Sequence, residues 1–293
     1  MVTRKDPARI ALAVVAYAVL YYAISGYLFE PLFYWAGGLL VAGTAGRLLA
    51  AGFANWLSLR IFENRDLLAI GLPLNRRAAD NLGLGLLGGI AGACLVLVPV
   101  LLVGAAHLTR SADQPSAGTL PFVTLLLMAG AIGEELLFRG YGFQILLAAL
   151  GPYATILPIS ILFALLHGRN PNATWFALVN TAGFGVLFGY AFLRSRDLWL
   201  PIGLHFGWNL TLPLFGANLS GLTMRVTGHE MAWTAGKLWS GGDYGPEASI
   251  LTSAVLVLLF GYVWKAPLRR QHSALTDPPA ENVPCEPSPP SVS

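Results

Sequence analysis

The chain has 293 residues, of which 55% are hydrophobic and only 11% are charged, and its mean hydropathy is +0.62. Soluble domains carry about 25% charged residues, so this composition excludes an ordinary soluble protein and predicts an integral membrane protein. Nothing in the sequence, with its net charge of +3, points to a nucleic-acid partner. The two cysteines, Cys94 and Cys285, offer neither a disulfide framework nor a CxxC metal site.

Eight apolar stretches are candidates for membrane-spanning helices, because about 20 helical residues cross the hydrocarbon core. The fifth is short for a full span, and the first is too long for the apolar part of a secretory signal, so we expect it to be retained. The predicted fold is all-α, a polytopic membrane helix bundle of about eight transmembrane helices. The stretches cover residues 10–29, 33–57, 82–106, 119–149, 153–167, 173–193, 198–215 and 248–264.

The basic residues predict which side of the membrane each end of the chain faces. With the amino terminus taken as cytoplasmic, 12 Lys and Arg fall on the inner side and 4 on the outer side, while Arg47 and Arg139 lie within spans. By the positive-inside rule we expect both termini in the cytoplasm of a multi-pass protein, in the plasma membrane if the source is prokaryotic. We expect one transmembrane domain at 1–265 and a disordered Pro- and Ser-rich cytoplasmic tail at 266–293.

Two carboxylates lie well inside a predicted span. Of the seven Asp and eight Glu, only Glu134 and Glu135 do so, and Glu30 lies at a boundary. An ionisable group at membrane depth costs at least a few kcal/mol, so it normally faces the bundle interior and marks a functional site. Glu135 and Arg139 are four residues apart and can neutralise each other, whereas Glu134 points about 100° away and lacks a local partner. A purely structural ion pair is the alternative explanation.

Two histidines lie in or at the ends of spans. His167 follows Phe163 by four residues and His205 precedes Asn209 by four, so each pair shares a helix face. Either histidine alone is better explained as a buried structural residue. Together with Glu134, however, they could hold and deprotonate a water, or bind a metal ion in a site of two histidines and one carboxylate. Asn209 and a protonated His205 are donors suited to a developing oxyanion.

Three motifs in the sequence resemble those of a known family. The stretches EELLFR, FALLH and HFGWN follow the patterns EExxxR, FxxxH and HxxxN, in that order. In a protein of about eight spans, this order resembles the CPBP family, which holds the type II CAAX prenyl proteases and the Abi-type bacteriocin-processing or self-immunity proteins. The resemblance covers about residues 119–215, which we therefore expect to be the catalytic core.

The resemblance implies an intramembrane endopeptidase and gives each motif residue a role. Glu134 and His167 would activate the attacking water, and His205 and Asn209 would stabilise the oxyanion. A metal-free mechanism and one that uses a divalent metal such as zinc fit these residues equally. The metal, if present, would be held by Glu134, His167 and His205.

The remaining motif residues would support the site, and the family implies the kind of substrate. Glu135, Arg139 and Phe163 are expected to be structural. The implied partners are a lipid bilayer and a membrane-associated peptide or protein, which in CAAX processing is prenylated. No HExxH motif and no GxSG within a span occur, so neither a site-two type of zinc protease nor an intramembrane serine protease is indicated.

Two other classes of protein remain open at this stage. In a proton-coupled carrier, Glu134, His167 and His205 would form a relay, and in a non-catalytic scaffold the bundle would act through binding alone. The enzyme hypothesis also requires that the helices bring His167 and Glu134 to the same depth in the membrane. Straight vertical helices would leave His167 near the outer end of its span and Glu134 near mid-membrane, so tilt, a short fifth helix or a break within the membrane is required.

Overall fold

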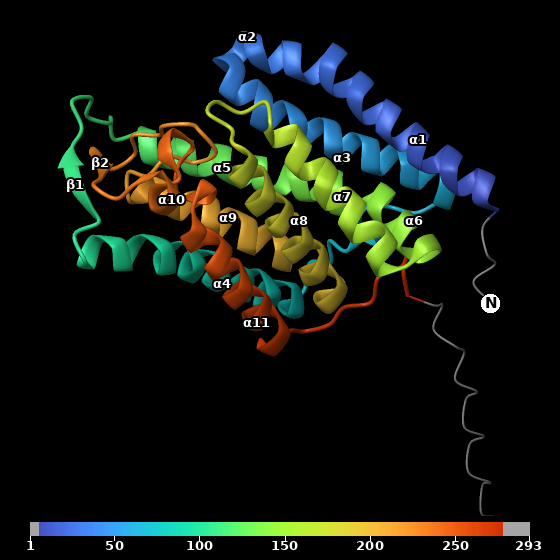
Figure 1. Cartoon of the computed structure of the whole chain (residues 1–293). Coiled ribbons are helices and arrows are strands. Elements are labelled where there is room, and N and C mark those ends of the chain that lie inside the picture. Colours follow the sequence, from blue (N-terminus) through green and yellow to red (C-terminus); the bar gives the residue numbers. More distant parts are fainter. Residues whose placement is uncertain (1–5, 278–293) are drawn as a thin grey trace, which may run out of the picture.

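The computed structural model describes residues 6–277, and within this range the chain is almost entirely helical (Figure 1). The helices pack side by side in one bundle, and the two strands pair antiparallel with Ala106 opposite Trp233. The main elements are α1 (Pro7–Ile24), α2 (Glu30–Val41), α3 (Arg47–Ser58), α4 (Arg76–Leu102), β1 (Ala106–Arg110), α5 (Thr119–Arg139), α6 (Tyr141–Leu150), α7 (Pro152–His167), α8 (Trp175–Ser195), α9 (Trp199–Leu214), β2 (His229–Trp233), α10 (Lys237–Ser240) and α11 (Ile250–Lys265), with π-turns η1 (Ser25–Phe29) and η2 (Ala42–Gly46).

The first two predicted spans form a helical hairpin whose turn differs from the prediction. Residues 7–63 are helical almost throughout, but Gly37 and Gly38 leave helical geometry, and Gly38 has a φ of 74° that favours glycine. The chain reverses there, so α1 packs against α3. The sequence predicts the boundary beside Glu30, whereas the helix continues past it. Pro31 does not end the helix; it directly follows the π-turn η1, where the regular i→i−4 hydrogen-bond pattern is already interrupted.

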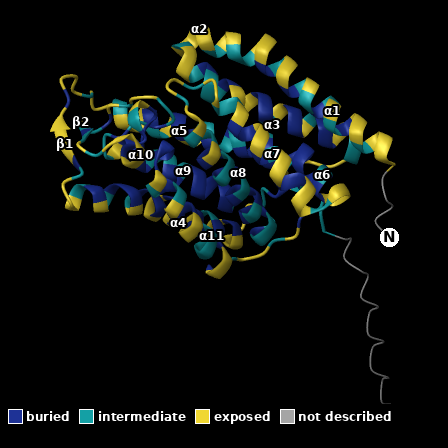
Figure 2. Cartoon of the chain, in the orientation of Figure 1, coloured by how far each residue is buried: buried dark blue, intermediate teal, exposed yellow. Residues whose placement is uncertain are grey.

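Four helical stretches of the described chain are long and apolar enough to cross a membrane: Pro7–Glu63, Arg76–Leu102, Thr119–Leu150 and Trp175–Ser195. The first of these is the hairpin, and α7 and α11 are apolar but shorter. Figure 2 shows exposed residues along α1 and α2, and many of the large ones are apolar, as expected of a surface that contacts lipid. The all-α membrane fold is confirmed, whereas the number of eight spans stays a prediction.

Loops that were predicted to share one side of the membrane meet at the same end of the bundle. At one end, Arg9 donates a hydrogen bond to the carbonyl of Phe62, and Arg194 donates one to the carbonyl of Trp264. The opposite end carries β1, β2 and α10 (Figure 1). This arrangement agrees with the alternation of loops assumed in the prediction. Which end faces the cytoplasm stays a prediction, as does the single domain at 1–265.

The first part of the predicted tail is packed chain. The amide of Gln271 donates a hydrogen bond to the carbonyl of Ser195, and the buried hydroxyl of Ser273 donates one to Gln144. The expectation of disorder therefore does not hold for residues 266–277. Residues 278–293, on which the rest of that expectation falls, lie outside the described residues.

Glycines permit the close contact between α4 and α9. A Cβ added at Gly85 would collide with the carbonyl oxygen of Leu200, and one added at Gly89 would collide with that of Leu204. Small residues allow such close approach in membranes, where van der Waals packing contributes strongly to helix association. Because His205 follows Leu204 directly, this contact positions a candidate site residue.

Replacing Gly89 by Ala is expected to lower the free energy of unfolding by about 1–3 kcal/mol, because the added methyl group meets backbone that cannot rotate away. Gly83→Ala is the matched control in the same helix: no atom beyond its chain neighbours and the backbone of its own helix lies within 4 Å of an added Cβ, and Ala is the better helix former. Thermal unfolding in detergent should show a lowered midpoint for Gly89→Ala alone. Equal midpoints for the two variants would contradict the proposed contact.

Candidate active site

Glu134, His167 and His205 come from three helices and meet at one point. Glu134 lies on α5, His167 is the last residue of α7, and His205 lies in the first half of α9. Oε2 of Glu134 is 3.8 Å from Nε2 of His167 and 3.8 Å from Nε2 of His205. That oxygen is buried and accepts no hydrogen bond from residues 6–277. The structure therefore brings the three side chains within a distance that one bridging water can span.

A break after α5 brings His167 to this depth. The predicted span 119–149 is divided at Gly140 into α5 and α6. An added Cβ at Gly140 would collide with Asn55 and with the helix backbone, so the break requires glycine. Because α6 separates the end of α5 from the start of α7, the 16 residues of α7 end beside Glu134. The short fifth helix and the break are two of the arrangements that the enzyme hypothesis needed.

Hydrogen bonds to the opposite ring nitrogens orient both histidines. Nδ1 of His167 lies 2.8 Å from the carbonyl oxygen of Phe163, and because a carbonyl oxygen can only accept, Nδ1 carries the proton. In the neutral form of the ring, Nε2 is then the unprotonated nitrogen, and it faces Glu134. Nδ1 of His205 lies 3.0 Å from Oε1 of Glu135, and a carboxylate at this position favours a proton on that nitrogen too.

Glu135 links His205 to Arg139. Its oxygen Oε1 accepts a hydrogen bond from Nη1 of Arg139 at 3.2 Å as well as the one from His205. Both charged side chains are almost completely buried, with 0% of Glu135 and 1% of Arg139 exposed. Nη2 of Arg139 also donates to the carbonyl of Gly185 on α8 at 3.0 Å. The ion pair of Glu135 with Arg139, which their spacing predicts, is present. Glu135 also orients His205, a contact that the spacing did not predict.

Aromatic rings surround this ion pair and the histidines. The guanidinium carbon of Arg139 lies 5.0 Å from the ring centroid of Phe163 and 5.3 Å from that of Phe188, within the range of a cation–π interaction. Phe163 also packs against the ring of His167, and Phe188 stacks on the ring of His205 at 4.9 Å. Phe163 thus contacts both Arg139 and His167. In the same way, Phe188 contacts both Arg139 and His205.

Asn209 lies one turn after His205 on the same face of α9. It is half-buried, and its side-chain amide makes no hydrogen bond within the part of the chain that the structure describes. An amide without a partner beside the imidazole is available to a ligand. Its predicted role as a donor to an oxyanion stays a prediction.

The sequence did not predict the buried carboxylate of Glu247. Its Oε1 accepts a hydrogen bond from the indole N–H of Trp208, and its Oε2 accepts from the amide and the hydroxyl of Ser220. Burial raises the pKa of this carboxyl, and its charge is close enough to His167 for the two to interact. Glu247 therefore fastens the segment after β2 to α9 beside the site. The only signal in the sequence was its place directly before the apolar stretch 248–264.

The three predicted metal ligands do not form a metal site as they are placed. Within residues 6–277, no group of three His, Cys, Asp or Glu side chains is arranged to hold a metal ion. Nitrogen and carboxylate ligands of zinc lie about 2.0–2.2 Å from the ion. Glu134, His167 and His205 have suitable donor atoms, but they do not form such a group, so we derive no step through a metal.

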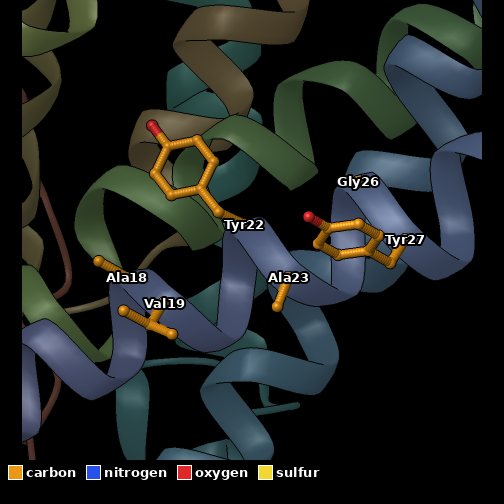
Figure 3. A pocket seen from close by; sticks show the side chains of 6 residues that line it. All are labelled: Ala18, Val19, Tyr22, Ala23, Gly26 and Tyr27. Atoms are coloured by element: carbon orange, nitrogen blue, oxygen red, sulfur yellow. The ribbon is translucent and has the colours of Figure 1, made fainter.

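An open hollow on the outer face of α1 and η1 contains none of these residues (Figure 3). Its only polar side-chain groups are tyrosine hydroxyls, and Tyr27 is 90% exposed. The hollow has no carboxylate, imidazole or amide, so the candidate active site remains the one around Glu134. Its lining residues are Ala18, Val19, Tyr22, Ala23, Gly26 and Tyr27.

The fold and the site define a helical membrane protein with a centre of carboxylate and imidazole groups among its helices. Residues 115–211, about a third of the chain, match the sequence model of a family described as type II CAAX prenyl endopeptidase Rce1-like. The match confirms the resemblance drawn from the three motifs, and it supports a membrane protease of the CAAX type that acts on a membrane-anchored peptide or protein. No curated protein matches the chain.

Removing one partner of the buried ion pair should destabilise the protein far more than altering Glu134. Arg139→Met leaves the Glu135 carboxylate buried with only His205 as partner, so we expect the free energy of unfolding to fall by about 3–5 kcal/mol. Glu134→Gln removes no direct hydrogen bond and should leave the unfolding midpoint close to that of the wild type. Thermal unfolding in detergent compares the two variants. A larger loss for Glu134→Gln would contradict this division between structural and free carboxylates.

Proposed function

We propose that the chain is an intramembrane endopeptidase that hydrolyses a peptide bond in a membrane-associated peptide or protein, with Glu134 as general base. One observation carries the proposal: a buried carboxylate oxygen without a hydrogen-bond partner in residues 6–277 lies 3.8 Å from Nε2 of His167 and of His205. The family match supports a CAAX-type peptidase, and the roles of the single residues rest on their geometry.

A water between Glu134 and His167 is oriented for attack. It donates one hydrogen to Oε2 of Glu134 and the other to the unprotonated Nε2 of His167, so that a lone pair on its oxygen points away from both acceptors. As the water oxygen bonds to the carbonyl carbon of the scissile peptide, Glu134 takes the proton. Proton transfer of this kind contributes roughly 10²–10⁴-fold to a rate.

His205 and Asn209 are placed to stabilise the negative charge that develops on the carbonyl oxygen. As an imidazolium, His205 keeps its Nδ1–H on Glu135 and donates its Nε2–H toward the site, while the amide of Asn209 supplies a second donor. The C–N bond then breaks, and the proton held by Glu134 passes to the leaving amine. One water is consumed, and the products are a carboxylic acid and an amine.

The substrates we propose are CAAX-type termini or the bacteriocin and immunity peptides processed by related proteins. Glu134 lies in Thr119–Leu150, a stretch apolar enough to cross a membrane, so the bond that is cut must reach the site from within or beside the bilayer. A membrane-anchored peptide meets this requirement, because its anchor keeps it at the bilayer.

Glu134→Gln should lower the cleavage rate of a membrane-anchored peptide by about 100-fold or more, because an amide cannot take the proton from water. The assay uses purified full-length protein in detergent or in vesicles. Asp80→Asn is the matched control: it makes the same change of a carboxylate to an amide, but on α4, where Asp80 lies 3.9 Å from Arg269 and away from the site. Full activity of Glu134→Gln would remove the proposed base.

Treatment with a metal chelator should leave cleavage unchanged, because the proposed steps use only side chains and water. The purified protein is dialysed against EDTA or phenanthroline and assayed with the same peptide. Loss of activity that zinc restores would show that the site closes around a metal and would overturn the metal-free form of the proposal.

A further inference from the structure

Glu247 is a buried carboxylate that the proposed chemistry does not use. It is 8% exposed and lies in a short 3₁₀ helix, Pro246–Ala248, directly before α11. Its Oε1 accepts a hydrogen bond from the indole N–H of Trp208, and its Oε2 accepts from the amide and the hydroxyl of Ser220. Burying a carboxylate costs free energy unless it is hydrogen-bonded, and this one is bonded to two separate parts of the chain.

The bond to Trp208 reaches the helix that carries the proposed oxyanion donors. Trp208 lies three residues after His205, on the same side of α9, and directly before Asn209. Its side chain is 2% exposed and packs edge-on against Phe184 of α8, with 4.7 Å between the ring centroids. Because the indole is packed between helices and bonded at its N–H, the bond to Glu247 restricts rotation of α9 about its axis. The direction of the Asn209 amide depends on that rotation.

The bonds to Ser220 reach the end of α7. Ser220 has a φ of 50°, which is uncommon for a residue with a side chain, and its two bonds to Glu247 hold it in this conformation. Gly221 packs so closely on Pro171 that an added Cβ would collide with the carbonyl oxygen of Pro171. Pro171 belongs to the turn that begins directly after His167, the last residue of α7. The segment that Glu247 holds therefore supports this turn.

The backbone around Glu247 is itself fixed to α8. The buried side-chain amide of Asn180 donates hydrogen bonds to the carbonyl oxygens of Glu247 and Ser249, at 2.8 and 3.0 Å. The hydroxyl of Ser253 donates in turn to Oδ1 of Asn180 at 2.7 Å. The carboxylate thus has a fixed position between α9 and the turn after α7.

We infer that Glu247 is a positioning residue that holds His167 and Asn209 in a fixed relation across the site. This inference rests on the proposed function, because the two side chains act on one peptide bond only when α7 and α9 keep their relative positions. A displacement of about 1 Å that begins far from the reacting atoms can lower a rate about 100-fold. Glu247 itself touches neither the substrate nor the attacking water.

Glu247→Gln should lower the kcat for cleavage of the membrane-anchored peptide by roughly tenfold or more and leave KM nearly unchanged. An amide side chain has one acceptor oxygen and two N–H donors, so it cannot accept from both the indole and the Ser220 amide. Glu230→Gln is the matched control, because Glu230 also accepts a hydrogen bond from a serine hydroxyl, but on β2, where its partners are Ser111 and Arg225. A wild-type kcat in Glu247→Gln would overturn the inference.

Trp208→Phe tests the same bond from its other side. It removes the indole N–H and keeps an aromatic ring against Phe184, so we expect kcat to fall again with little change in KM. Because both variants break one shared bond, Glu247→Gln should lower kcat less in the Trp208→Phe protein than in wild type. Effects that multiply, or a wild-type kcat in Trp208→Phe, would overturn the inference, also where Glu247→Gln fails to fold.

Limited proteolysis separates this inference from the proposed function, because it needs no peptidase activity. Arg169 is exposed in the turn after His167, where trypsin can reach it. In Glu134→Gln protein, adding Glu247→Gln should speed trypsin cleavage after Arg169 several-fold, whereas adding Glu230→Gln should not. Equal rates overturn the inference and leave the endopeptidase standing wherever wild type cleaves. Faster digestion supports the inference even where wild type cuts no peptide, which would count against the endopeptidase alone.

Discussion

The arrangement of the site depends on one shared oxygen, Oε1 of Glu135, which accepts hydrogen bonds from Arg139 and from His205. A buried carboxylate is costly unless it is paired, and a single charged partner on the same helix would satisfy only the local charge. By accepting from His205 as well, Glu135 ties α5 to α9 and fixes which ring nitrogen faces Glu134. The close contact of α4 with α9 in turn holds α9, and with it His205, in position against the rest of the bundle.

Neighbouring carboxylates in one helix have different tasks because of the helix period. Glu135 points into the buried pair, where its Oε1 accepts from Arg139 and His205, whereas Glu134, about 100° around the helix, points to the two Nε2 atoms. In the described residues each of the two carboxylates keeps its Oε2 buried and without a hydrogen-bond partner. The aromatic rings of Phe163 and Phe188 separate the guanidinium of Arg139 from solvent and hold the imidazoles in place. A carboxylate that is paired with Arg139 and His205 thus stands beside one that has no direct hydrogen bond within the described residues.

Local spacing in the sequence predicted the parts of the site that lie within one helix. The pairing of Glu135 with Arg139 follows from their separation of four residues, and the all-α membrane class follows from composition. The bond from Glu135 to His205 could not be predicted in this way, because periodicity does not show which helices adjoin. The same limit applies to Glu247, whose partners are 27 and 39 residues away in sequence. The turn at Gly38 was misplaced because the helix continues through Pro31, which directly follows the π-turn η1.

The central claim is that Glu134 and His167 act on one water, and a double-mutant cycle tests it most directly. Cleavage rates are measured for wild type, Glu134→Gln, His167→Gln and the double variant. If both groups hold the same water, the second change adds little to the first, and the double variant is about as slow as Glu134→Gln alone. Effects that multiply would show that the two residues act independently and would contradict the account.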